Sequence, residues 1–313
     1  QIGRTTFAIG SKFKFENQLN DEEKRNSGFC VDRNYVCAAM ARYLKDHFDN
    51  SKATSGSADF ISYYNTRVLF VDSEKHRVMV RAQDKDSPLT TDDIFPLEYD
   101  ILLGCDGIRS VVRNAFLINH RDFEFDIKDN FGTGKSIHIT RPKDVDGGHF
   151  MLLINCMLNV SAFVLPERGD QLNVFFGYGL HKPCDPELLS QDPAVVAAYA
   201  KKNFQGFGMD FEEFGQQWTE QDFSTFQMVH CNFYHSLKLR ALLLGDAAHA
   251  TVPNIGQGMN TALADASALN KLLDTHTDDW NKVLPAFSED RVKEGNALTE
   301  LSFNTYSLDG GMM

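Results

Sequence analysis

The sequence has few of the features that mark metal-binding, disulfide-rich or membrane-spanning proteins. Its six cysteines are scattered without a Cys-x-x-Cys pair, so neither a zinc site nor a disulfide framework is expected, and a reducing intracellular setting, cytoplasmic or organellar, is favoured. The most apolar stretch, residues 150–166, is interrupted by asparagine and serine and is too short and too polar for a transmembrane helix. We therefore expect no metal ligand and no transmembrane segment in this chain.

Clustered positive charge is also missing. The formal net charge is −12 and no long basic run occurs, which argues against nucleic acid as a partner, because binding to a phosphate backbone needs clustered Lys and Arg. What the sequence does contain is an ordinary globular composition, with 42% hydrophobic and 24% charged residues among 313. That composition suits one large domain or two smaller ones.

The side chains that usually carry catalysis do not form a recognisable set. No Gly-x-Ser-x-Gly elbow is present. His230 and His235 have no partner ligand at a metal-like spacing, so both are expected to be core or surface residues. For His249 a structural role is favoured over that of a catalytic base. No catalytic side chain is therefore assigned.

Apolar periodicity predicts alternating helices and strands after an irregular segment over residues 1–28. One helix is expected to start near Ile108, and helical spacing also extends over residues 32–48, 194–203, 260–274 and 280–306. Strand-like runs lie within residues 60–82, 99–104, 136–140, 150–155, 161–165, 172–178 and 239–244. The strands in the middle of the chain predict a mostly antiparallel sheet domain over residues 114–235, inserted between two other segments.

The segment from Gly245 to Asn260 is the strongest signal. A buried-type strand ends at the carboxylate of Asp246, the chain turns through Pro253, and glycines open the next helix. Such a helix start offers unpaired backbone N–H groups and a partial positive charge, which suit an electron-rich ligand such as a flavin. A lone Gly-Asp pair is more often only a cap and a turn, but the complete order of features favours a ligand site.

This segment resembles the second FAD motif of the group A flavoprotein hydroxylases, and its Gly-Gln-Gly-Met-Asn ending is most similar to that of the kynurenine 3-monooxygenases. The resemblance implies FAD contacts from Gly245, Asp246, Pro253, Gly256, Gly258, Met259 and Asn260.

Two further segments resemble the same family. Residues 99–113, with Asp106 and Gly107, are similar to its Asp-Gly motif, which serves both FAD and NADPH. Read alone, this pair is a strand-to-helix turn. Arg33 stands in the first turn of a helix, where its charge opposes the helix dipole, and the resemblance places such an arginine at the FAD pyrophosphate. A solvated surface arginine is the other reading.

The C-terminal helix resembles the substrate side of the kynurenine 3-monooxygenases. Positions where that family has Asn and Glu fall on Thr305 and Leu308, so Thr305 and the neighbouring Tyr306 are the candidate substrate residues. The aromatic residues that the family carries after its proline are replaced by Asn254 and Ile255. These departures predict a pocket that holds the amino-acid end of kynurenine poorly or with other residues.

The dinucleotide fingerprint Gly-x-Gly-x-x-Gly is absent. The resemblance therefore implies that a βαβ unit within roughly 80 residues precedes Gln1, and that the 313 residues alone hold FAD weakly.

The implied fold is α/β, with a discontinuous glutathione-reductase-like FAD-binding domain and an inserted, mostly antiparallel β-sheet substrate domain. Residues 1–113 would form a partial FAD-binding domain, residues 114–235 the substrate domain, and residues 236–313 an FAD-binding segment with the C-terminal helix. The implied function is hydroxylation of a small aromatic substrate, in which NADPH reduces FAD and O2 adds to give a flavin C4a-hydroperoxide. A flavoprotein reductase or halogenase of the same fold, or a truncated non-catalytic flavin-binding relative, are the alternatives.

Overall fold

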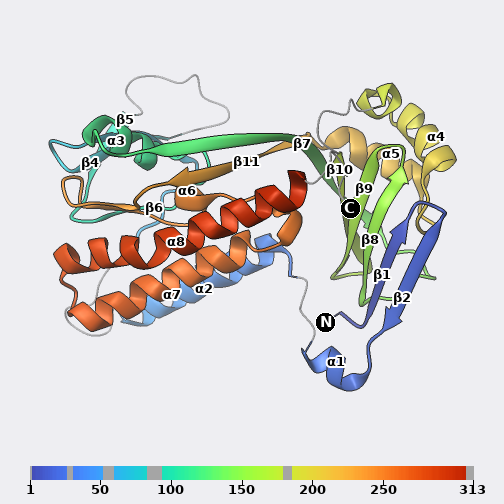
Figure 1. Ribbon diagram of the computed structural model, residues 1–313, viewed down its shortest axis with the longest axis horizontal. Coiled ribbons are helices and arrows are strands. Elements are labelled where there is room, and N and C mark those ends of the chain that lie inside the picture. The colour runs from blue at the N-terminus through green and yellow to red at the C-terminus, as the bar shows by residue number, and fades with distance from the viewer. Residues whose placement is uncertain (1, 27–30, 52–59, 83–93, 179–184, 308–313) are drawn as a thin grey trace. The chain divides into compact units, whose positions relative to one another are not determined.

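The computed structural model describes residues 2–26, 31–51, 60–82, 94–178 and 185–307, and the chain divides into two compact units (Figure 1). Unit 1 groups residues 1–62 with 132–225, and unit 2 groups residues 63–131 with 226–308. Two long strands, β7 (Phe125–Thr140) and β11 (Ser224–Cys231), contribute residues to both. Contacts thus group residues 1–62 with the sheet-rich middle of the chain. The predicted domain boundaries at 113 and 235 stay a prediction.

A seven-stranded sheet in the order β11-β7-β10-β9-β8-β1-β2 builds unit 1. The strands that lie wholly in this unit are β1 (Arg4–Ile9), β2 (Phe13–Gln18), β8 (His149–Met157), β9 (Val160–Glu167) and β10 (Gln171–Tyr178). The pairs β1–β2, β8–β9, β9–β10 and β10–β7 are antiparallel, whereas β1 and β8 are parallel. The predicted mostly antiparallel sheet is confirmed.

Two helices cover one face of this sheet. In β10 buried and half-buried residues alternate, as expected for a strand that has one face in the core. That face packs against α4 (Pro193–Asn203) and α5 (Phe211–Glu220), through side chains spaced by four residues such as Phe214 and Trp218. Burying each large apolar side chain stabilises the fold by about 1.5–3 kcal/mol. The remaining helices of unit 1 are α1 (Asp21–Asn26), α2 (Arg33–Ser51) and the 3-10 turn η2 (Pro186–Leu189).

The expectation of an irregular segment over residues 1–28 is wrong, because β1, β2 and α1 lie there. Local pattern alone does not show this. The residues of β2 are all exposed, and β1 is held by its parallel pairing with β8, far along the chain. Strands of this kind depend on a distant partner more than on their own apolar alternation.

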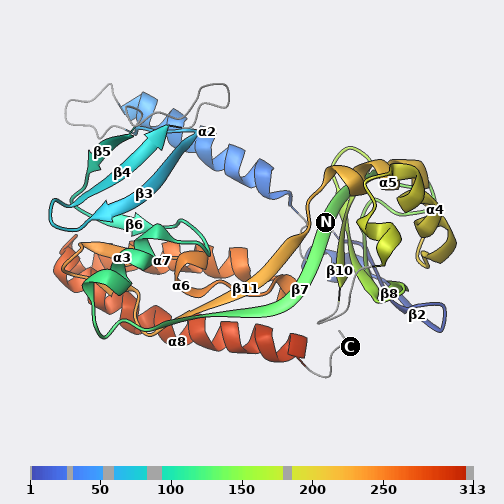
Figure 2. The same ribbon diagram turned by 90° about the horizontal axis from the view of Figure 1, so that it is seen from above.

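Unit 2 contains two three-stranded sheets. The strands β3 (Thr66–Asp72), β4 (Arg77–Ala82) and β5 (Ile94–Glu98) lie side by side in an antiparallel sheet (Figure 2). The other sheet has the order β12-β13-β6, made of β12 (His235–Ser236), β13 (Ala241–Leu243) and β6 (Leu102–Gly104). The helices of unit 2 are α3 (Val111–Asn119), α6 (Asp246–His249), the 3-10 turn η3 (Pro253–Ile255), α7 (Gly258–His276) and α8 (Trp280–Ser307). The helices predicted near Ile108 and over residues 260–274 and 280–306 are confirmed as α3, α7 and α8.

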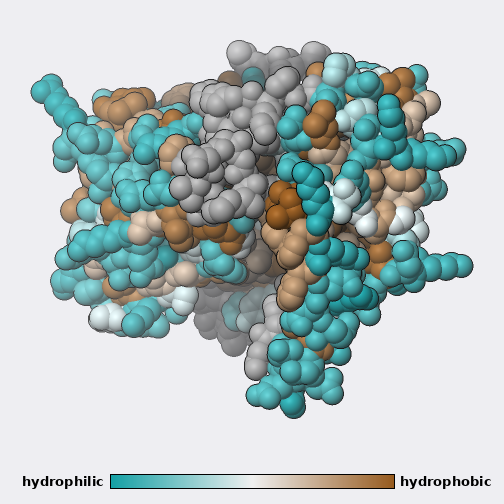
Figure 3. All heavy atoms as spheres, turned by 45° about the vertical axis from the view of Figure 1, so that its right-hand side comes forward, coloured by the Kyte–Doolittle hydropathy of each residue, from teal (hydrophilic) through white to brown (hydrophobic). Residues whose placement is uncertain are grey.

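The surface mixes polar and apolar side chains. Hydrophobic patches interrupt the hydrophilic face seen in Figure 3. Large apolar side chains that are at least half exposed include Phe13, Phe15, Tyr35, Met40 and Tyr43. Singly exposed apolar side chains are normal on a folded protein and carry no functional argument. Over the described residues, none of the helices combines the length and apolar character that crossing a membrane requires.

Candidate functional site

The two strongest sequence motifs end on neighbouring strands of unit 2. Strand β13, which leads into Gly245 and Asp246, runs parallel to β6, which leads into Asp106 and Gly107. The Leu244 N–H donates to the Gly104 carbonyl at 3.0 Å, so the pairing continues to the start of both turns. Because parallel strands end at the same edge of a sheet, the two carboxylates emerge on one side, where ligands of open α/β sheets bind.

Asp246 is the one exposed residue in an otherwise buried run from residue 241 to residue 250. Gly245 precedes it with φ 56° and ψ −138°, a backbone conformation that an L side chain rarely adopts. Among the described residues, no hydrogen bond or ion pair involves the Asp246 carboxylate. The fold therefore presents the carboxylate of Asp246 outward from a buried turn.

The start of α7 follows directly. Gly256 adopts the left-handed conformation at φ 64°, which ends η3 and turns the chain into Gly258. Met259 and Asn260 are exposed in the first turn, and Pro253 is exposed in η3. The first N–H groups of a long helix have no intrahelical partner and favour negative charge. The start of α7 therefore offers unpaired N–H donors on an exposed surface.

Asp106 has a structural task at the start of α3. Its carboxylate accepts from the Ser110 hydroxyl at 2.6 Å and from the backbone N–H groups of Val111 and Val112 at 2.7 and 3.2 Å. Ser110 is the N-cap and accepts from the Arg113 N–H. This cap explains why α3 begins three residues after Ile108, where the helix was expected to start. The cofactor contacts of Asp106 and Gly107 stay a prediction.

Arg113 connects the two motifs, which sequence reasoning missed. Its guanidinium is 1% exposed and donates to the Ala247 carbonyl at 2.8 Å and to the Ile108 carbonyl at 2.5 Å. One side chain thus ties the turn after β6 to α6, across 134 residues of sequence. Burial lowers the pKa of this guanidinium from its ordinary value. Its place at the end of the Asp-Gly motif was the available signal.

The structure says less about the remaining predicted site residues. Arg33 is exposed at the start of α2, which Asp32 caps through the Asn34 N–H at 2.6 Å, and it belongs to unit 1. Thr305 and Tyr306 lie in the last turn of α8, but their side chains are outside the described part of the structure, as is all of Leu308. The roles proposed for these residues stay predictions.

His249 is a buried structural histidine, 3% exposed, with its Nε2 atom 2.7 Å from the carboxylate of Asp265. His230 lies 4.0 Å from Glu300, and His235 is half-buried in β12. Across the described ranges, no three His, Cys, Asp or Glu side chains are arranged to hold a metal ion.

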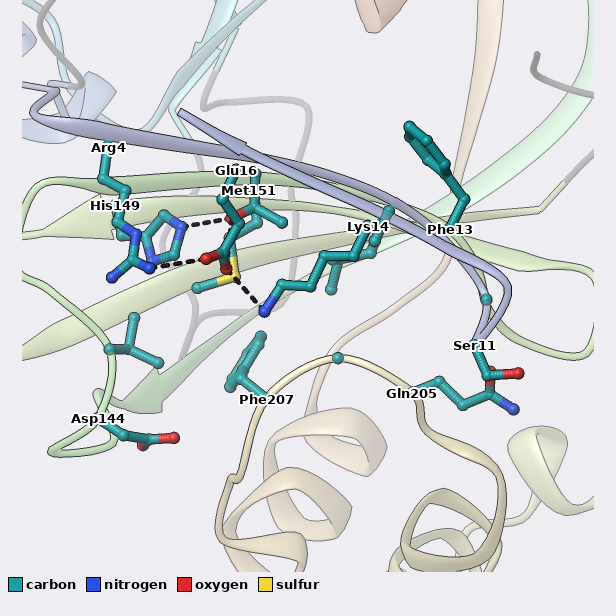
Figure 4. Close-up of a pocket in the computed structure, with 16 residues that line it drawn as sticks. Arg4, Ser11, Phe13, Lys14, Glu16, Asp144, His149, Met151, Gln205 and Phe207 are labelled. Carbon is teal, nitrogen blue, oxygen red and sulfur yellow. Dashed lines mark hydrogen bonds and ion pairs between the residues drawn. The ribbon is translucent and has the colours of Figure 1, made fainter. Parts of the chain in front are cut away.

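Each unit contains a cavity. The one in unit 2 has a volume of about 260 Å³ and is lined by β7, β11 and α8, including Lys128, His230 and Phe303. The one in unit 1 has about 430 Å³ and lies beside the β1–β2 hairpin. Figure 4 shows Arg4 and Lys14 of that hairpin converging on Glu16, at 2.8 and 2.6 Å. No sequence motif falls on this second cavity.

Comparison with known proteins identifies the family of the chain. The model of the family described as FAD binding domain matches residues 63–302. The chain belongs to this FAD-binding monooxygenase family. The matched range takes in both strand-end turns and the whole of α7.

Individual relatives are distant. The chain is 28% identical over 253 residues to violacein synthase of Chromobacterium violaceum, covering 79% of this chain and 56% of that protein. It is 27% identical over 226 residues to kynurenine 3-monooxygenase of Anopheles gambiae, covering 69% of this chain and 44% of the relative. The chain thus spans about half the length of these relatives. In fold it is similar to Klebsiella pneumoniae HpxO, solved with FAD and uric acid, with a TM-score of 0.70 at 18% identity over 98% of this chain and 73% of that one.

Proposed function

We propose that the protein is an NADPH-dependent flavoprotein monooxygenase that hydroxylates a small aromatic substrate, with unit 2 forming part of a discontinuous glutathione-reductase-like FAD-binding domain. The observation that carries this proposal is the outward carboxylate of Asp246 beside the start of α7, at the edge where β6 and β13 end. Bound there, FAD would supply the redox chemistry that activates oxygen.

Most of the predicted cofactor residues have a physical task in this proposal. Asp246 accepts hydrogen bonds from hydroxyls of the ribityl chain. The N–H groups at Gly258, Met259 and Asn260 stabilise the negative charge that collects on the flavin ring near N1 and the C2 carbonyl. Arg33 and the Asp106-Gly107 turn serve the phosphate side.

The cavity of unit 2 is the proposed substrate site. The α8 residue Ser302 holds η3 in place, because its hydroxyl accepts from the Val252 N–H at 3.3 Å and its carbonyl accepts from the Asn254 amide at 3.0 Å. Phe303, the next residue of α8, lines the cavity, with Lys128 Nζ 5.7 Å from the centre of its ring. The site therefore lies beside the segment assigned to the flavin and offers an aromatic face.

The charges around this cavity favour a substrate that carries both signs. Lys128, Asp126 and Glu300 line it, with Lys128 Nζ 3.8 Å from the Asp126 carboxylate. A carboxylate and an amine on one aromatic compound would each find a partner of opposite charge there. Since Thr305 and Leu308 replace the Asn and Glu of the kynurenine 3-monooxygenases, these cavity residues would hold the amino-acid end in their place.

The test is an assay of the full-length protein. Purified protein is supplied with FAD, NADPH and a panel of aromatic acids and amino acids, kynurenine first, and NADPH oxidation is followed together with mass spectrometry of the product under ¹⁸O2. The proposal expects at least one compound to stimulate NADPH oxidation and to gain one labelled oxygen. Stimulated oxidation with no oxygen incorporated would favour a reductase instead. When chloride and bromide are added to the assay, incorporation of either halide would favour a halogenase.

A further inference from the structure

Asp265 is a fully buried carboxylate in the middle of α7, and it joins three separate elements. One oxygen, Oδ2, accepts from the backbone N–H of Gly245 at 2.9 Å and lies 2.7 Å from His249 Nε2. The other oxygen, Oδ1, accepts from Arg291 Nε of α8 at 2.8 Å. Asp265 is 0% exposed, and His249 and Arg291 are 3% and 6% exposed. Three donors from the turn, α6 and α8 therefore meet on one carboxylate.

Such a cluster is costly to build. A buried carboxylate loses its hydration, and the loss is offset only when its lone pairs are met by well-placed donors. Burial alone would raise the pKa of Asp265, but the hydrogen bonds from His249, Gly245 and Arg291 outweigh it and keep the pKa below its ordinary value. Apolar residues of similar volume often stabilise a core equally well. Unlike apolar contacts, the hydrogen bonds of this cluster fix the orientation of the groups that they join.

The contacts of Asp265 bracket Asp246. Gly245 and His249 are the residues just before and three after Asp246, and the Gly245 carbonyl also accepts from the N–H groups of Ala248 and His249 at 2.9 Å each. The backbone of α8 approaches closely at Gly295, where an added Cβ would stand 2.8 Å from the His249 ring. The turn that carries Asp246 is therefore held at both ends, by one carboxylate of α7.

We propose that Asp265 is a positioning residue for the cofactor: through Gly245 and His249, it sets the direction in which Asp246 presents its carboxylate to the ribityl chain of FAD. This inference rests on the proposed function, because it needs Asp246 to contact FAD. It adds that the affinity for FAD depends on a side chain that does not touch FAD. Arg291 completes the cluster by neutralising the buried charge.

The test is a double-mutant cycle in the full-length protein. The dissociation constant of FAD is measured by quenching of flavin fluorescence, and the melting temperature of each variant is measured without FAD. Asp246→Ala and Asp265→Asn are each expected to weaken FAD binding about tenfold, the effect of losing a hydrogen bond to a charged group. The double variant is expected to bind FAD no more weakly than Asp246→Ala alone. Asp274→Asn, on the exposed side of the same helix, is the matched control and should bind like the wild type.

The FAD affinities of the variants decide between the positioning role of Asp265 and its alternatives. If the two losses multiply in the double variant, or if Asp265→Asn binds FAD like the wild type, the positioning role is refuted while the proposed function stands. If Asp246→Ala itself leaves FAD binding unchanged, the assigned cofactor contact fails, and with it the role of Asp265.

A second pair of variants covers the case in which Asp265→Asn does not fold. His249→Gln keeps a donor toward Asp265, whereas His249→Leu removes it at similar volume. The glutamine variant is expected to stay near wild-type FAD affinity and the leucine variant to lose about tenfold. Equal FAD affinity in the two variants would overturn the proposal.

Discussion

Asp246 and Asp106 follow adjacent strand ends, yet their carboxylates have different surroundings. The oxygens of Asp106 accept three hydrogen bonds from the first turn of α3, whereas Asp246 projects from a buried turn with its carboxylate exposed. The same residue type at similar positions thus acts as a helix cap in one case and faces outward in the other. Single substitutions separate the two roles.

Replacing Asp106 by Ala is expected to lower the free energy of unfolding by about 1 kcal/mol, the usual worth of an N-terminal cap. Urea denaturation of the protein without FAD measures this change. Asp106→Asn keeps acceptor capacity on one oxygen and is expected to lose less. Equal stability of the alanine variant and the wild type would contradict the capping role.

Replacing Asp246 by Ala is expected to show the opposite pattern. Because its carboxylate is exposed, the melting temperature without FAD should change little, whereas less flavin should stay bound to the full-length protein after gel filtration. Flavin absorbance per protein reports the result. Full retention of flavin would rule out the assigned contact.

Glu16 gives a prediction about pH. Hydrogen bonds from Lys14 and Arg4 lower its pKa from 4.5 to about 2. The ionised carboxylate therefore contributes stability that is complete above pH 4.5 and is lost as the pH falls toward about 2. Glu16→Gln should destabilise the protein in urea at pH 7, and this difference should shrink at pH 3. Glu220→Gln, at the exposed end of α5, is the control and should show no such change.

At the scale of elements, the local sequence pattern predicted most helices and strands. It missed those that depend on pairing with a segment far along the chain. The apolar spacing of α7 and α8, the apolar runs of β8 and β9 and the alternation in β10 are visible in sequence, because these elements bury many of their own residues. The hairpin of β1 and β2 is not, since its position depends on β8. For α5, which was not predicted, the sequence does carry a signal, with Asp210 as cap and Phe214 and Trp218 one turn apart.

The candidate site also combines residues that the sequence predicted with residues that it did not predict. Motif resemblance identified the residues that face outward from the turns, because they are spaced closely in one segment. It could not identify Arg113 or Asp265, whose partners lie 134 and 20 residues away and whose importance comes from being buried. Buried polar networks are specified by tertiary structure, so a short motif does not reveal them.

Helix α8 depends on a glycine for its closest approach. A Cβ at Gly295 would overlap the Tyr234 hydroxyl and crowd the His249 ring, so Gly295→Ala is expected to destabilise unit 2 by about 1–3 kcal/mol, as overpacking does. Lys293→Ala, exposed two residues earlier, is the matched control, with an expected change within about 0.5 kcal/mol. Both are measured by urea denaturation. If Gly295→Ala is as stable as Lys293→Ala, the neighbouring side chains can move to make room for the added methyl group.

At the scale of the whole molecule, the residues assigned to FAD are unevenly distributed. All except Arg33 belong to unit 2. Hydrogen exchange of the full-length protein, followed by mass spectrometry of its peptides, should therefore slow on adding FAD in peptides covering residues 102–113 and 241–262. Peptides from strands β9 and β10 of unit 1 should not change. Protection confined to β9 and β10 would place the cofactor elsewhere.

The parallel pairing of β1 with β8 also has a consequence during synthesis. Thr6 and His149, hydrogen-bonded side by side in the finished sheet, are 143 residues apart in the chain. A ribosome that adds about 5–20 residues per second needs about 7–30 s to make that stretch. Throughout this interval the hairpin of β1 and β2, with the exposed rings of Phe13 and Phe15, has no strand to pair with on the β1 side. During translation the edge of β1 that later pairs with β8 therefore stays open for many seconds, and an open strand edge can pair with other chains.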